Sequence, residues 1–199
     1  MKRYSLVTRF ALCGLLLLAP ALPAHAGPQP AIVLVAKPGL LDPNFRETVV
    51  LVVRTPGAQT LGVILNRPTD LKLETLWQGK TSAEGYRDRV FFGGPVLNRT
   101  LVALFRSATP PSAPAFEVLE HVYFSMHPDN LERLLSQNAQ AYRLYAGFSG
   151  WAPSQLEDEI EREGWYVVPA REDLLFRKNT AGMWLELVEQ ATGARAQLY

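Results

Sequence analysis

Short apolar runs alternate with turn-forming residues through the first half of the chain. Three runs rich in β-branched or aliphatic residues cover residues 31–36, 48–53 and 61–65, and a Pro-Gly pair follows each of the first two. Runs of this length between glycine and proline are typical of strands buried on both faces. We therefore predict three strands here, and we expect the third to pair antiparallel with the second across a short turn.

The second half mixes further strand patterns with helical ones. Apolar runs predict strands at 90–92, 100–105, 121–126, 142–148 and 165–168, whereas spaced leucines predict a helix at 129–137. Ser154 and Glu157 form the pattern of a capping box at the start of another helix. More helices are expected at 71–77, 170–176 and 183–190. Because hairpin-like neighbours come early and helices concentrate late, the pattern favours an α+β fold over regular βαβ alternation.

Three of the apolar runs end in turns built from glycine, proline or asparagine, within residues 61–68, 90–96 and 147–156. A buried strand that ends in a special backbone geometry often carries a functional site. We expect the three turns to converge on one surface or cleft. The candidate ligand-binding residues are Asn66, Arg67, Gly93, Gly94, Gly150 and Trp151.

Each candidate also has a purely structural interpretation. The Arg67 guanidinium suits recognition of carboxylate or phosphate. Alternatively, Asn66 turns the chain and Arg67 pairs with an internal carboxylate, since polar residues at strand ends often serve turns. Gly93 and Gly94 lack the lysine and helix of a phosphate-binding loop, so they could instead let two backbones approach closely.

Catalytic patterns are weak in this sequence. Ser149 stands in a sequence close to a nucleophile elbow, but Trp151 occupies the position where that motif requires glycine. His121 and His127 have no obvious partners, and no cysteine follows Cys13. We therefore predict no catalytic residue, no metal site and no cofactor. An enzyme would be expected to gather Asn66 and Arg67 with a histidine and a carboxylate in one cleft.

The first 26 residues have the three-part organisation of a secretory signal peptide. A basic start is followed by an uncharged stretch from Phe10 to Ala24 and by a small-residue cleavage site at Ala24-His25-Ala26. We expect cleavage before Gly27, export to the periplasm or beyond, and a single domain over residues 27–199. No later segment is long and apolar enough for a membrane span.

Removal of this segment changes the charge balance. Three of the 20 basic residues lie in it, so 17 basic and 19 acidic residues give the remaining chain a formal net charge of −2. The basic residues are also scattered along the chain. Because nucleic-acid binding depends on neutralising phosphates, we expect no nucleic-acid partner.

Five motifs, taken in order, closely resemble the bacterial AlgH/YqgE family over about residues 31–190; they occupy residues 38–45, 48–51, 62–69, 90–96 and 147–160. The resemblance implies an α+β fold in which a mixed, bifurcated β-sheet closes partly into a small barrel surrounded by helices. It implies no agreed activity, cofactor or catalytic residue. The family label suggests a regulator of transcription.

An export signal separates the protein from the chromosome and so disfavours a promoter role, since members of that family are typically cytosolic. We therefore expect an exported, non-enzymatic binding or regulatory module, with a protein or small molecule as its ligand. Two alternatives stay open: a hydrolase or other enzyme with an unrecognised site, and a transcriptional regulator.

Overall fold

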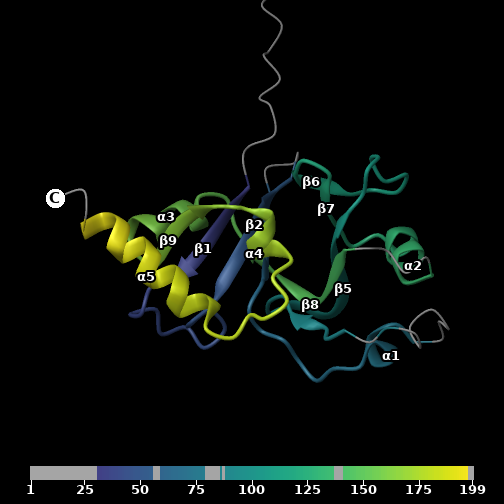
Figure 1. Ribbon diagram of the computed structural model, residues 1–199, viewed down its shortest axis with the longest axis horizontal. Coiled ribbons are helices and arrows are strands. Elements are labelled where there is room, and N and C mark those ends of the chain that lie inside the picture. Colours follow the sequence, from purple (N-terminus) through teal and green to yellow (C-terminus); the bar gives the residue numbers. More distant parts are fainter. Residues whose placement is uncertain (1–30, 56–58, 79–85, 87, 137–140, 197–199) are drawn as a thin grey trace, which may run out of the picture.

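One sheet organises the chain. The computed structural model describes residues 31–55, 59–78, 86, 88–136 and 141–196; the expected signal peptide lies outside these residues. In this part of the chain nine strands pair into a sheet (Figure 1), namely β1 (Ile32–Ala36), β2 (Val49–Arg54), β3 (Thr60–Ile64), β4 (Phe91–Phe92), β5 (Val96–Arg106), β6 (Phe116–Leu119), β7 (Val122–Ser125), β8 (Tyr142–Trp151) and β9 (Trp165–Pro169).

The strand order along the sheet is β6-β7-β5-β8-β3-β2-β1-β9, and every neighbouring pair in it is antiparallel. β4 branches from this path and pairs parallel with β8. The sheet curls into a half-barrel, which confirms the expected bifurcated α+β sheet. The predicted antiparallel pairing of the second and third strands is also confirmed, with Leu51 opposite Val63.

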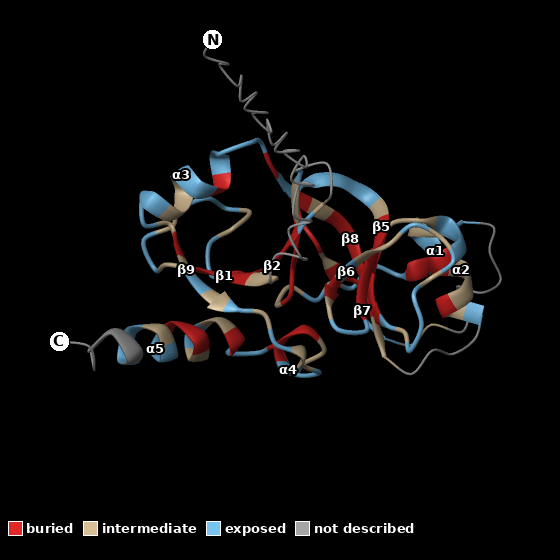
Figure 2. Cartoon of the chain, turned by 90° about the horizontal axis from the view of Figure 1, so that it is seen from above, coloured by how far each residue is buried: buried red, intermediate tan, exposed pale blue. Residues whose placement is uncertain are grey.

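Helices cover both faces of the sheet. Figure 2 shows α3 (Gln155–Glu161) on one side of β1 and β9, and α4 (Glu172–Leu175) with α5 (Met183–Ala196) on the other side. α1 (Leu73–Leu76) and α2 (Pro128–Ser136) lie at the far end, beyond β5. No helix in the described ranges is long and apolar enough to cross a membrane.

This arrangement explains the unbroken apolar runs. Val33 and Val35 join the core cluster that contains Leu187 of α5, whereas Leu34 joins the cluster that contains Leu156 of α3. Alternate residues of one strand thus pack against different helices, as expected for strands covered on both faces. A third cluster packs α1 and α2 against β5 and β8.

One local expectation was wrong, and one strand was missed. Ser154 adopts a left-handed φ of 65° and makes no side-chain cap; instead the Gln155 carboxamide accepts the Ala152 N–H at 3.0 Å. β6 had no prediction at all, because prolines crowd residues 107–114 just before it and its run is short. In both places contacts made elsewhere in the fold outweigh the local sequence pattern.

Candidate binding site

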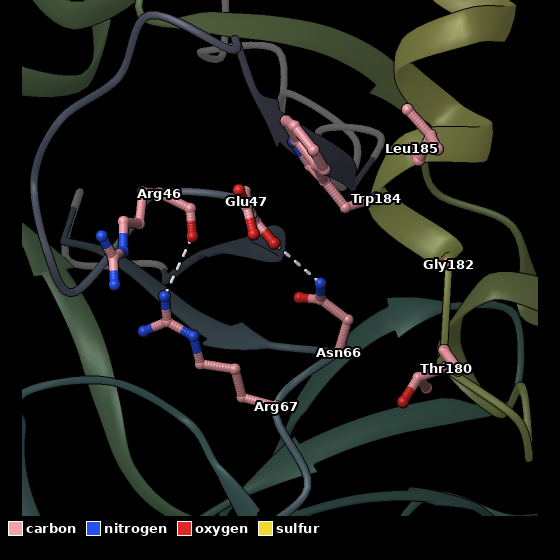
Figure 3. Close-up of a pocket in the computed structure, with 9 residues that line it drawn as sticks. Arg46, Glu47, Asn66, Arg67, Thr180, Gly182, Trp184 and Leu185 are labelled. Atoms are coloured by element: carbon pink, nitrogen blue, oxygen red, sulfur yellow. Dashed lines mark hydrogen bonds between the residues drawn. The ribbon is translucent and has the colours of Figure 1, made fainter.

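A pocket of about 560 Å³ opens where the end of β3 meets the start of α5 (Figure 3). Three segments far apart in sequence form its walls: the loop that precedes β2, the turn after β3, and the approach to α5. Its lining residues are Arg46, Glu47, Asn66, Arg67, Thr180, Ala181, Gly182, Trp184 and Leu185. Two of the six candidate residues from the sequence, Asn66 and Arg67, are among them.

Asn66 fastens the turn after β3 to the start of β2. Its side-chain oxygen accepts the Val49 N–H at 2.9 Å, and its side-chain nitrogen donates to the Glu47 carbonyl at 2.9 Å. Both ends of the carboxamide are therefore engaged with main chain. Asn66 shapes the pocket floor by fixing two of its segments.

Arg67 holds the loop that precedes β2. Its guanidinium donates to the carbonyls of Asn44 at 2.5 Å, Arg46 at 2.9 Å and Pro43 at 3.4 Å. The expected structural alternative, a pairing with an internal carboxylate, is thus replaced by main-chain acceptors. Burial, followed by the charge of Arg46, lowers the pKa of Arg67, while Asp42 and Glu47 act in the opposite sense.

Positive charge is not fully matched at the pocket mouth. The exposed Arg46 side chain has no hydrogen bond or ion pair within the described residues, and it lies beside the Arg67 guanidinium (Figure 3). Glu47 is the single acidic residue among those that line the pocket. Glu47 also has a φ of 56°, a strained value for a residue other than glycine. Strain of this kind is often found at binding sites.

The opposite wall comes from the approach to α5. Thr180 is 8% exposed, and Gly182 takes a φ of 72°, which glycine adopts without strain. The Trp184 indole donates to the Ala36 carbonyl at 2.7 Å, so its ring is fixed. Leu185 is 52% exposed. This wall was missed in the sequence because nothing local marks residues 180–185 as a partner of residues 46–67.

The four other candidate residues do not line this pocket. A Cβ on Gly93 would lie 2.1 Å from the Gly147 carbonyl oxygen, and one on Gly94 would lie 2.4 Å from Phe148 main-chain atoms. These two glycines therefore allow the strand end at β4 to touch β8, which supports the close-approach interpretation. Gly150 lies in β8, and a Cβ there would meet only side-chain atoms at ordinary contact distance, the nearest 3.8 Å away on Val96. A ligand role for these glycines stays a prediction.

Trp151 is connected to the pocket indirectly. Its ring stacks on Phe45 at a centroid distance of 6.3 Å, and Phe45 belongs to the loop whose carbonyls Arg67 binds. A further residue, which the sequence had not singled out, holds this end of β8: Glu159 accepts the indole N–H of Trp151 at 3.1 Å and that of Trp165 at 3.0 Å. A ligand role for Trp151 also stays a prediction.

Candidate catalytic groups lie outside the pocket. His121 follows β6 and His127 precedes α2, and neither lines the pocket. Ser149 is fully buried, and its hydroxyl donates to the Gly93 carbonyl at 3.3 Å. Among the described residues no group of three His, Cys, Asp or Glu side chains could hold a metal ion.

Comparison with known proteins points to one family. A family model described as AlgH-like (DUF179) matches residues 33–196. A UPF0301 protein of Streptomyces avermitilis is 32% identical over 164 residues, which cover 79% of this chain and 83% of the relative. A UPF0301 protein of Thermobifida fusca is 34% identical over 175 residues, which cover 82% of this chain and 87% of the relative.

Two solved structures share the fold. The solution structure of AlgH from Pseudomonas aeruginosa gives a TM-score of 0.67 at 24% identity, covering 82% of this chain and 88% of the other. The crystal structure of a Corynebacterium diphtheriae protein gives a TM-score of 0.64 at 23% identity, covering 82% of this chain and 87% of the other. At these identities the likeness shows the fold alone.

Proposed function

This chain belongs to the AlgH-like family, and from that premise we propose that it is a non-enzymatic binding module whose ligand occupies the pocket between the β3 turn and α5. The pocket volume lies within the range of roughly 300–1,000 Å³ that is typical of small-molecule sites. Its walls combine fixed polar groups with the apolar surface of Trp184 and Leu185. Such a mixture supplies both orientation and apolar contact for a ligand.

The observation that carries this proposal is the composition of the pocket. It gathers Asn66 and Arg67 with one carboxylate, that of Glu47, but with no histidine, serine or cysteine. The polar atoms of Asn66 and the Arg67 guanidinium already bind main chain. One hydroxyl, that of Thr180, also lines the pocket, but no hydrogen bond joins it to Glu47 among the described residues, so the lining shows no nucleophile held against a general base.

Native mass spectrometry tests this proposal. The protein is incubated with a small-molecule extract of the cells that produce it, and we expect a bound mass that survives desalting. Leu185→Glu places a charge in the pocket and should abolish the bound mass. Leu41→Glu is the matched control, since Leu41 is 87% exposed and does not line the pocket. A bound mass equally retained by both variants would place the ligand elsewhere.

We also propose that the protein acts outside the cytoplasm. The support is the order of charged, apolar and small residues in positions 1–26. Mass spectrometry of the protein isolated from the periplasm should show an N-terminus at or near Gly27. An intact Met1 in that fraction would contradict the proposal.

A further inference from the structure

The pocket contains the N-terminus of a long helix. α5 has 14 residues, and its first turn lines the pocket through Trp184 and Leu185, directly after Gly182, which also lines it. Glu186 is the first residue whose N–H makes a bond of the helical type, to the Gly182 carbonyl at 3.0 Å. The N–H groups of Trp184 and Leu185 have no acceptor in the described part of the chain. Free N–H groups and the helix dipole favour a negative charge at this position.

A second feature, independent of the helix end, points into the pocket. Residue Thr180 is only 8% exposed, and its hydroxyl has no hydrogen-bond partner among the described residues. Figure 3 shows this side chain on the pocket wall, with its oxygen toward the side occupied by Arg67. The oxygen itself is open to the pocket, so a ligand atom that accepts its hydrogen would gain a hydrogen bond there.

The charges of the lining residues favour the same kind of ligand. The charged residues that line the pocket are two arginines, Arg46 and Arg67, and one acidic residue, Glu47. The other nearby carboxylate on the helix, Glu186, is bound to Arg177 at 2.5 Å. A guanidinium without an ion pair, as in Arg46, suits carboxylate or phosphate recognition.

The rest of the wall is apolar. The Trp184 ring is fixed by its bond to Ala36, and Leu185 is half exposed beside it. An inorganic ion alone would leave these side chains without a partner. We infer that the ligand is an amphipathic oxyanion, a carboxylate or phosphate carried on an apolar group, with the oxyanion at the start of α5 near Thr180 and the apolar group against Trp184 and Leu185. This inference rests on the proposed binding function.

An NMR titration tests it with defined probes. The ¹⁵N-labelled protein is titrated with octanoate, octyl phosphate, octanol, acetate and inorganic phosphate, and the amides of residues 182–185 and the Trp184 indole are followed. Octanoate or octyl phosphate should bind at least about tenfold more tightly than octanol, acetate or inorganic phosphate. Only octanoate and octyl phosphate carry both an oxyanion and an apolar chain. The stronger of the two identifies the head group.

Variants locate the oxyanion. Thr180→Val keeps the shape of the side chain but removes the hydroxyl. This variant should bind the tighter-binding probe about three- to tenfold more weakly. Arg46→Met should have a similar effect, whereas Arg99→Met, at an exposed arginine outside the pocket, should have none. If octanol binds as tightly as octanoate, the inferred oxyanion is wrong, although the pocket still binds a ligand. If no probe moves these amides although the cell extract yields a bound mass, the ligand class is wrong but the binding function stands.

Discussion

At the scale of single residues, the polar side chains at the end of β3 act mainly on the main chain. Asn66 and Arg67 were expected from the sequence to form a polar site, and they do line the pocket. Their partners could not be predicted. The acceptors of Arg67 are the main-chain carbonyls of Pro43, Asn44 and Arg46, and every residue has a carbonyl, so the sequence does not mark these three. Only the position of the loop in space gives the guanidinium its acceptors.

Replacement of Arg67 by methionine should release this loop. The variant loses charge-assisted bonds to three carbonyls, so we expect the free energy of unfolding to fall by about 2 kcal/mol. Arg46→Met is the matched control, because that exposed side chain has no described partner, and the change should stay within about 0.5 kcal/mol. Urea denaturation measures both. Equal losses in the two variants would show that Arg67 does not anchor the loop.

The glycines divide into two kinds that the sequence alone could not separate. Gly93→Ala would place a methyl group 2.1 Å from the Gly147 carbonyl oxygen, so the two strands would have to separate. We expect a loss of at least about 3 kcal/mol or no folded protein. Gly150→Ala meets no atom closer than 3.8 Å and should cost less than about 0.5 kcal/mol. Thermal unfolding followed by circular dichroism compares the pair, and similar melting temperatures would refute the distinction.

At the scale of elements, most strands and helices were predicted to within a few residues, whereas the cap of α3 was not. The runs in β1, β2 and β3 are apolar on both faces, and such runs can hardly be anything but buried strands. Helix starts depend on single side chains, and at Ser154 a left-handed backbone replaced the expected cap. The position of the segment before α5 could not be predicted, because it depends on long-range contacts of Arg177. The Arg177 side chain binds Glu186, and the Arg177 carbonyl accepts a hydrogen bond from Arg143.

The ion pair at the start of α5 should make this element sensitive to acid. The hydrogen bond from Arg177 lowers the pKa of Glu186 below its usual value of 4.5. A folded-state pKa below the unfolded one gives stability that is present above pH 4.5 and is lost as the pH falls through the folded value. Glu186→Gln removes the titration. The difference in urea midpoint between wild type and variant should therefore shrink as the pH falls below about 4.5 and vanish in the acid range where Glu186 is protonated in the folded protein. A difference that persists there would contradict the ion-pair role.

At the scale of the whole molecule, the charge distribution bears on the family label. Residues 27–199 carry a formal net charge of −2, and neither the sequence nor the pocket shows a basic stripe. We expect no sequence-specific DNA binding. Fluorescence anisotropy at about 50 mM salt, where phosphate contacts are strongest, is the harshest test. Saturable submicromolar binding that discriminates a duplex from its scrambled version would restore the promoter role.

The pairing of β1 with β9 has a consequence for how the chain acquires its structure. β1 lies near the start of the domain and β9 near its end, yet Val33 stands opposite Val168. The last partner of the first strand is therefore synthesised after nearly all the rest. Pairings this distant in sequence slow folding, because loop-closure entropy is lost before the contacts form. If the chain is exported as we propose, slow closure of the sheet would keep the polypeptide unfolded longer and so favour its passage through a secretion channel before the fold is completed.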